Sequence, residues 1–208
     1  MTDERKRQIL EAAAGVIAER GFCETRIADV AGRIGLSPAL ILYYFPSKDA
    51  LLAQALAYRD RQFFDLVEAH LAGSTDPVEQ LGRLISACCP PTEDLDRDDN
   101  EWQLWLETWA RSRHDRLLAA ERLRMDGALR STIARIVEAG VREGSMTCPD
   151  PCEFSTMFSS LLDGLAIQVL LQDPSVDGAT MARICRDLAV RELSIPATHS
   201  IRLSPTAA

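Results

Sequence analysis

Apolar residues recur with the spacing of α-helices along nearly the whole chain, and glycines and prolines fall between the periodic stretches. In residues 3–20, for example, Ile9, Ala13, Val16 and Ile17 share one helical face. We find no convincing segment with the apolar–polar alternation of a half-buried strand. The pattern therefore predicts an all-α protein of about nine helices.

The N-terminal part contains two short predicted helices joined by a tight turn. The first spans residues 25–34 and starts with Thr25 as its N-cap. Gly35 allows the turn, after which Ser37 and Pro38 open a second helix of about two turns. Helices before and after this pair would brace it, as in a helix-turn-helix. Such a second helix fits the major groove of DNA, about 12 Å wide, with its first residues at the base edges.

Acidic and basic residues are spread unevenly around the net charge of −8. Residues 1–61 carry nine Lys and Arg against eight Asp and Glu, whereas residues 62–208 carry fourteen against twenty-three. The N-terminal part is thus the part suited to approach phosphates. It also holds both lysines of the chain, Lys6 and Lys48, and Lys48 begins the next predicted helix.

Three segments of this part, residues 25–31, 34–37 and 43–52, carry a specific pattern. Together they resemble the N-terminal domain of the TetR family of transcriptional regulators. The resemblance implies a three-helix DNA-binding domain over residues 1–50, with its helix-turn-helix at residues 25–45.

Residue by residue, the resemblance implies a set of contacts to DNA phosphates and base edges. The residues expected to make these contacts are Thr25, Arg26, Ser37, Pro38, Ala39, Leu40, Tyr43, Tyr44 and Lys48. Two positions depart from the common pattern of the family, in which Gly often stands at Ala39 and Tyr at Leu42. Because the second helix then offers few hydrogen-bonding side chains, we expect methyl contacts and DNA shape to contribute much of the specificity.

The three tryptophans of the chain stand at positions 102, 105 and 109, on one helical face with Leu106. A stripe of this kind is typical of core packing, and it also suits a wall that binds a flat apolar ligand or a cation. Residues 102–114 and 161–165 resemble the C-terminal domain of the BetI-like branch of the family.

In that branch the C-terminal half holds a ligand cavity, so the resemblance implies a small-molecule effector. The residues expected to bind it are Trp102, Trp105, Leu106, Trp109, Met157 and Leu161. Glu101 and Glu107 on the same helix would suit a cationic effector.

Residues 51–195 form the expected ligand-binding and dimerisation domain. The helix predicted over residues 151–171 is apolar around much of its circumference, so it needs cover on more than one side. With the helix over residues 178–192 it would form a four-helix bundle in a homodimer. The residues expected at this interface are Phe154, Phe158, Leu165, Val169 and Leu170. Residues 196–208 are expected to be a disordered tail.

The six cysteines show no Cys-x-x-Cys pair, so we expect reduced thiols and neither a metal nor a cofactor. The charged N-terminus lacks the apolar core of a signal peptide, and no apolar run approaches the ~20 residues of a membrane span. We therefore expect a cytoplasmic protein.

The leading interpretation is a homodimeric repressor that binds a palindromic operator on double-stranded DNA and is released by its effector. A thiol-based redox sensor that acts through Cys88, Cys89 or Cys185 is an alternative within this frame. A helical carrier or enzyme that uses the tryptophan-lined cavity is an alternative of another class. Because paired carboxylates, a nucleophile–base pair and a phosphate loop are all missing, we do not expect an enzyme.

Overall fold

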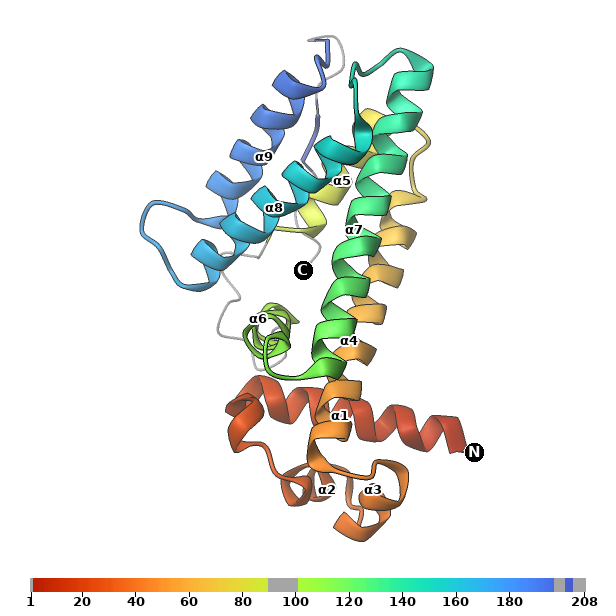
Figure 1. Cartoon of the computed structure of the whole chain (residues 1–208), viewed down its shortest axis with the longest axis vertical. Helices are drawn as coiled ribbons and strands as arrows, with labels where there is room; N and C mark the ends of the chain where they lie inside the picture. Colours follow the sequence, from red (N-terminus) through yellow and green to blue (C-terminus); the bar gives the residue numbers. More distant parts are fainter. Residues whose placement is uncertain (1, 90–100, 197–200, 204–208) are drawn as a thin grey trace. The chain divides into compact units, whose positions relative to one another are not determined.

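The computed structural model describes residues 2–89, 101–196 and 201–203. In these ranges it contains nine α-helices and no strand (Figure 1). They are α1 (Thr2–Glu24), α2 (Ile27–Ile34), α3 (Pro38–Tyr44), α4 (Lys48–Leu71), α5 (Pro77–Ala87), α6 (Glu101–Ser112), α7 (Arg116–Glu143), α8 (Pro151–Leu170) and α9 (Gly178–Glu192). The predicted all-α class is confirmed. No helix in the described ranges is both long and apolar enough to span a membrane.

The chain packs into two compact units. The first combines Met1–Phe64 with Asp96–Leu123, and the second combines Asp65–Leu95 with Arg124–Ala208. These bounds fall inside α4 and α7, so they differ from the division expected at residue 50. The physical reason is that Leu104 of α6 and Leu118 of α7 belong to the same hydrophobic core as α1 to α4.

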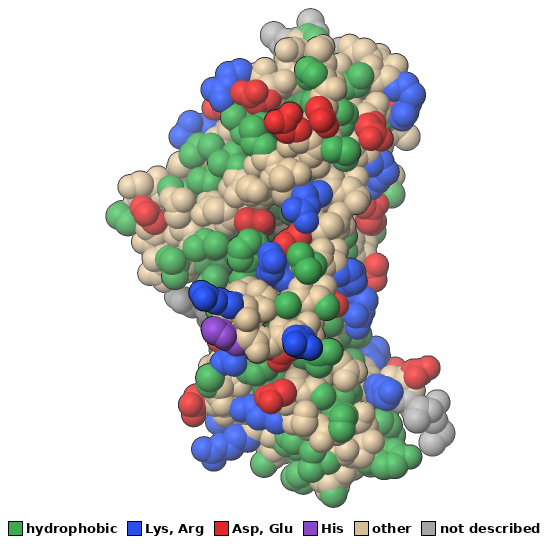
Figure 2. Space-filling view, viewed as in Figure 1, with side chains coloured by type: hydrophobic (Ala, Val, Ile, Leu, Met, Phe, Trp, Pro, Cys, Tyr) green, Lys and Arg blue, Asp and Glu red, His purple; other side chains and the backbone are tan. Residues whose placement is uncertain are grey.

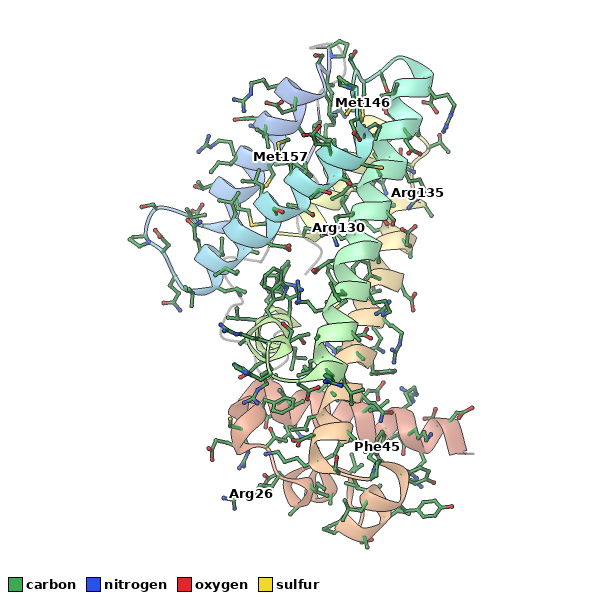
Figure 3. All side chains as sticks on the ribbon, viewed as in Figure 1. Arg26, Phe45, Arg130, Arg135, Met146 and Met157 are labelled. Atoms are coloured by element: carbon green, nitrogen blue, oxygen red, sulfur yellow. The ribbon has the colours of Figure 1, made fainter. Side chains whose placement is uncertain are left out.

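The core of the first unit is built on one face of α1. Ile9, Ala13, Val16 and Ile17 are buried there, as their helical spacing predicts. The side chains of the next three helices that pack around this face are Val30, Ala31, Ile41, Phe45, Leu51, Leu52 and Leu56. Figure 3 shows Phe45 among these helices rather than on the outside. Burying one such large apolar side chain stabilises the fold by about 1.5–3 kcal/mol.

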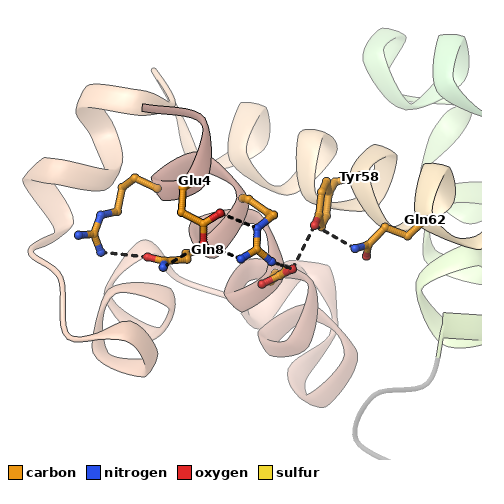
Figure 4. Close-up of polar contacts among 7 residues, drawn as sticks. Glu4, Gln8, Tyr58 and Gln62 are labelled. Carbon is orange, nitrogen blue, oxygen red and sulfur yellow. Dashed lines mark hydrogen bonds and ion pairs between the residues drawn. The ribbon is translucent and has the colours of Figure 1, made fainter. Parts of the chain in front are cut away.

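A polar network joins α1 to α4 along the edge of this core (Figure 4). The Tyr58 hydroxyl donates a 3.0 Å hydrogen bond to Glu11, and the Gln62 amide donates a 2.9 Å bond to the Tyr58 oxygen. Arg7 forms ion pairs with Glu11 and Glu4, both at 2.6 Å. Burial raises the pKa of Tyr58, and the hydrogen bond to Glu11 raises it further. The network therefore fixes the register of the first half of α4 against α1.

In the second unit, α8 and α9 lie side by side (Figure 1). The tail contributes to this unit, because Ile201 is only 5% exposed. A Cβ atom at Gly82 of α5 would lie 2.4 Å from the Arg202 carbonyl oxygen, so the missing side chain lets residues 201–203 lie on α5. Residues 201–203, which belong to the tail expected over residues 196–208, thus pack on α5 in the described structure.

Candidate DNA-binding surface and tryptophan cluster

The corner between α1 and α2 is held from inside by Thr25. This residue is fully buried, and its hydroxyl donates a 2.8 Å hydrogen bond to the Gly21 carbonyl. Gly21 has a φ of 75°, a left-handed conformation that favours glycine. The N-cap of α2 is Arg26 and not Thr25. The expected contact between the Thr25 hydroxyl and a phosphate does not fit this burial.

The turn between α2 and α3 has the geometry that its sequence predicts. Gly35 follows α2 with a φ of 64°, again in the left-handed region. The Ser37 hydroxyl oxygen accepts a 3.2 Å hydrogen bond from the Leu40 backbone N–H, and Pro38 occupies the first turn of α3. These three residues fix where α3 begins and which of its faces points outward.

The outward face of α3 is largely apolar. Its exposed side chains, which we call the reading surface, are Ser37, Pro38, Ala39, Leu42 and Tyr43. Tyr43 is 80% exposed and Leu42 46%, and hydrophobic atoms gather over this end of the first unit in Figure 2. Leu40 and Tyr44 are half-buried. Leu42 was absent from the expected contacts, although its i+3 spacing from Ala39 on a helix could have indicated it.

Two cations of the first unit lie where α2 and α4 begin. Arg26 is exposed at the start of α2, and Figure 3 shows its side chain extending away from the domain. In the described part of the chain no carboxylate pairs with its guanidinium. Lys48 is half-buried, and its Nζ donates a 2.7 Å hydrogen bond to the Cys23 carbonyl. Arg26 is thus open to a phosphate, while Lys48 also ties α4 to the end of α1.

The three tryptophans of α6 form one aromatic cluster together with Phe63 of α4. Ring centroids are 6.3 Å apart for Phe63 and Trp102, 6.1 Å for Trp102 and Trp105, and 5.6 Å for Trp105 and Trp109. All three tryptophans are half-buried, whereas Leu104 and Thr108 form the fully buried side of α6. The cluster is therefore separate from the side that packs into the core.

Trp109 has two further features. The guanidinium carbon of Arg122, on α7, lies 5.2 Å from the centroid of the Trp109 ring, within the range of a cation–π contact. The indole Nε1 of Trp109 is buried, and among the described residues no acceptor lies within hydrogen-bonding distance of it. Arg122 is not among the expected binding residues, because it lies on another helix, thirteen positions along the chain from Trp109.

The side of α6 away from the tryptophans contacts the end of α1. Glu107 forms a 3.2 Å ion pair with Arg111, whose guanidinium carbon lies 4.1 Å from the Phe22 ring centroid. Arg111 also donates a 2.6 Å hydrogen bond to the Cys23 sulfur. Glu107 is two residues from both Trp105 and Trp109, so it lies about 160° around the helix from them. It cannot supply a carboxylate to the aromatic cluster, and the Glu101 side chain lies outside the described residues.

On α8, the residues expected at a dimer interface mostly point inward. Phe154, Phe158, Leu165 and Val169 are at most 8% exposed within the single chain, and only Leu170 is half-buried. The opposite side, which we call the outer stripe, consists of Met157, Ser160, Leu161, Gly164, Gln168 and Leu171. Met157, labelled in Figure 3, is an exposed side chain. Its exposed fraction is 44%, and that of Leu171 is 68%. Met157 and Leu161, expected in the ligand site, thus belong to the outer stripe of the second unit.

Three of the six cysteines, Cys88, Cys89 and Cys185, are buried in the second unit. Burial raises the pKa of Cys88 well above its usual range, and it raises the pKa of Cys89 and Cys185 to about 12. These thiols therefore stay protonated near neutral pH, which disfavours reaction with oxidants. Cys23 and Cys152 are exposed.

Family models match both parts of the chain. Residues 9–55 match the model of bacterial regulatory proteins of the TetR family, and residues 77–194 match the C-terminal model of BetI-type transcriptional repressors. The HTH-type transcriptional regulator BetI of Yersinia pestis is 31% identical over 112 residues, which are 53% of this chain and 55% of that protein. The match thus spans about half the length of this curated relative. PksA of Bacillus subtilis is 25% identical over 88% of this chain and 86% of that protein.

Solved structures give the same result over a longer stretch. A transcriptional regulator from Saccharomonospora viridis, in complex with choline, is 34% identical with a TM-score of 0.82. The match covers 92% of this chain and 98% of that one. A TetR regulator from Haloarcula marismortui has the same fold, with a TM-score of 0.77 at 21% identity. With its helix-turn-helix and its BetI-type C-terminal half, the chain belongs to the TetR family of transcriptional regulators.

Proposed function

We propose that this regulator is a homodimeric repressor that binds a near-palindromic operator and is released by a small cationic effector. The observation that carries the proposal is the reading surface, a capped helix of a TetR-family chain whose exposed face has no partner among the described residues. Because its target is DNA, we place its action in the cytoplasm. We propose no catalytic activity.

On DNA, the reading surface would enter the major groove. Ala39 and Leu42 would contact thymine methyl groups, and Ser37 is the one hydroxyl near the start of the helix. Arg26, Tyr43 and Lys48 would contact phosphates on either side. Thr25 is not part of this set because it is buried.

Homodimerisation would use the outer stripe of α8 together with α9. Met157 and Leu171 are the exposed apolar side chains there, and a twofold partner would cover both. The pair of helices from each copy would then form a four-helix bundle. In such a dimer the two copies of α3 would stand about 34–36 Å apart, one turn of DNA.

For the effector we propose a quaternary ammonium compound of the choline class. The 34% identical regulator from Saccharomonospora viridis is in complex with choline, and this chain gathers its three tryptophans in one half-buried cluster. A cation without N–H donors cannot be held by hydrogen bonds to its nitrogen, so ring faces are suitable binding groups for it. Its effect on DNA affinity cannot exceed its differential affinity for the two states of the dimer.

The thiol-sensing alternative is less favoured by the structure. Its three candidate cysteines are buried, and their raised pKa values leave little thiolate to react with an oxidant.

The test is a titration of the purified dimer against labelled DNA from its own promoter region and against a scrambled duplex of equal length. We expect salt-sensitive binding that favours the promoter DNA and is lost when one half-site is scrambled. Choline should then release the DNA, whereas 3,3-dimethylbutan-1-ol, its uncharged isostere, should not. Equal binding to both duplexes would contradict the repressor. Release by the uncharged isostere at the same concentration would contradict a cationic effector.

A further inference from the structure

One side chain of the protein already occupies the face of a ring that a cationic effector would use. The Arg122 guanidinium carbon lies 5.2 Å from the Trp109 ring centroid. Trp109 is the last ring of the aromatic cluster, 5.6 Å from Trp105 by their centroids. The cluster therefore contains its own cation before any effector binds.

A guanidinium and a quaternary ammonium cannot share the same region of one indole face. Both are held there by the same attraction, that of a positive charge to the negative face of the ring. Arg122 has an advantage because it is tethered. Residues 113–115 alone separate α6, which carries Trp109, from α7, which carries Arg122. A tethered group competes at a high effective concentration. A free cation must therefore be present at a high concentration, or bind the ring more tightly, to displace the guanidinium.

From this geometry we infer that Arg122 is an internal competitor for the cation site on Trp109 and sets the effector concentration at which the protein responds. The inference rests on the proposed function, since it assumes that a cationic effector uses the aromatic cluster. When the effector binds, Arg122 leaves the ring, and the cation–π contact between α6 and α7 is lost.

A second feature of Trp109 indicates which chemical groups the ligand should carry. Its buried indole N–H has no acceptor among the described residues. Such a donor is costly to leave without a partner. A ligand that carries a hydroxyl or carboxylate oxygen beside its ammonium group can accept this hydrogen bond, which the Arg122 guanidinium cannot because it has only donors. The site is therefore suited to exchange Arg122 for a cation that also carries an oxygen acceptor.

The experiment compares the wild type with Arg122→Gln, and Arg116→Gln is the matched control. Arg116 is an exposed arginine on the same helix, so its replacement makes the same change in charge. The probe is tetramethylammonium chloride, which tests the ring face itself and does not need to be the natural effector. Its binding is followed by tryptophan fluorescence, since all three tryptophans of the chain lie in the cluster. Thermal melting of each variant checks that it is folded.

We expect Arg122→Gln to bind tetramethylammonium about three- to thirtyfold more tightly than the wild type, the range that corresponds to one cation–π contact. Arg116→Gln should match the wild type. The gain should persist at about 0.5 M sodium chloride, because a competitor on the ring is removed and not merely a distant charge. Unchanged or weaker binding in Arg122→Gln, a gain that disappears in high salt, or no binding to any of the three proteins would overturn the inference.

Choline release of operator DNA separates this inference from the proposed function. If choline releases DNA from wild type and Arg122→Gln at the same concentration, the proposed repressor function is supported and the inference about Arg122 is wrong. If tetramethylammonium binds Arg122→Gln more tightly than wild type but choline releases no DNA from either protein, the inference about Arg122 is supported and the proposed effector is wrong.

Discussion

The ammonium of Lys48 donates a 2.7 Å hydrogen bond to the carbonyl oxygen of Cys23, so the first turn of α4 is tied to the last turn of α1. An ammonium has three N–H donors, and this bond uses one of them. A side chain already held in place loses little conformational entropy when it meets a phosphate. Lys48 therefore connects α4 to α1 and is also a suitable ligand for a phosphate.

Replacing Lys48 by Gln should weaken binding to operator and to random DNA by similar factors. The proposed contact to a phosphate would carry no sequence information, so the loss should not depend on the DNA sequence. The slope of log K against log salt concentration should become smaller by about one, since one fewer counterion is released. Fluorescence anisotropy at four salt concentrations measures this slope. An unchanged slope would show that Lys48 connects the two helices but does not contact a phosphate.

Replacing Thr25 by Val should lower stability without changing the salt slope. The substitution keeps the shape but removes the 2.8 Å hydrogen bond to the Gly21 carbonyl, at a cost of about 1 kcal/mol. Urea denaturation measures the cost, and Thr25→Ser, which keeps the hydroxyl, should recover part of it. A reduced salt slope in Thr25→Val would contradict the internal role that burial gives this residue.

Replacing Gly164 by Arg should convert the proposed dimer to a monomer. A Cβ at Gly164 meets no atom within 4 Å in the single chain, so the fold should tolerate the new side chain. The long charged group would stand on the outer stripe, where a partner would have to cover it. Gly127→Arg on α7 is the control, because Gly127 has equally open surroundings. Sedimentation velocity distinguishes the two species. A dimeric Gly164→Arg would place the interface elsewhere.

The cysteines should divide into two classes toward an aromatic disulfide reagent at about pH 8. Cys23 and Cys152 are exposed and should react in the native protein. Cys88, Cys89 and Cys185 should react only after denaturation, because burial raises the pKa of each thiol. Mass spectrometry of the labelled peptides assigns each site. Rapid labelling of Cys88 or Cys185 in the folded protein would revive the thiol-sensing alternative.

Stability in acid should depend on the N-cap of α9. The Asp177 carboxylate accepts a 2.7 Å hydrogen bond from the Thr180 backbone N–H, and this bond lowers the pKa of Asp177 below its ordinary 3.8. Because the pKa of Asp177 is lowered in the folded state, its ionised carboxylate stabilises the fold at pH values above 3.8. This contribution is lost as the pH falls through the lowered pKa. The difference in unfolding free energy between wild type and Asp177→Asn should therefore shrink from about pH 6 to about pH 3. A constant difference in urea titrations would contradict this assignment.

Local signals in the sequence were sufficient to predict where the helices lie along the chain. Gly35, Ser37 and Pro38 act through their own backbone and nearest neighbours, so the start of α3 could be predicted from three adjacent residues. The same holds for Pro77 and Pro151, which stand in the first turns of α5 and α8. The family resemblance then indicated which helices are expected to contact DNA.

The direction in which a side chain points was harder to predict. Thr25 is of a residue type that favours the N-cap, yet it is fully buried and its hydroxyl donates a hydrogen bond to the Gly21 carbonyl. On α8, Phe154 and Phe158 are apolar enough for a dimer interface, but the single chain already buries them. Arg122 stands thirteen positions from Trp109. Its contact with the ring depends on how α6 and α7 pack, which no motif records.

The composition of the first unit has a consequence for how such a regulator can change its target. The unit joins Met1–Phe64 to Asp96–Leu123, so its hydrophobic core contains Leu104 and Leu118 from a distant stretch of the gene. Recombination that exchanges one continuous stretch of coding sequence cannot transfer this unit whole, because a new N-terminal part would arrive without the side chains that complete its core. We therefore expect new DNA specificity to arise more readily from single substitutions on α3 than from exchange of the whole unit.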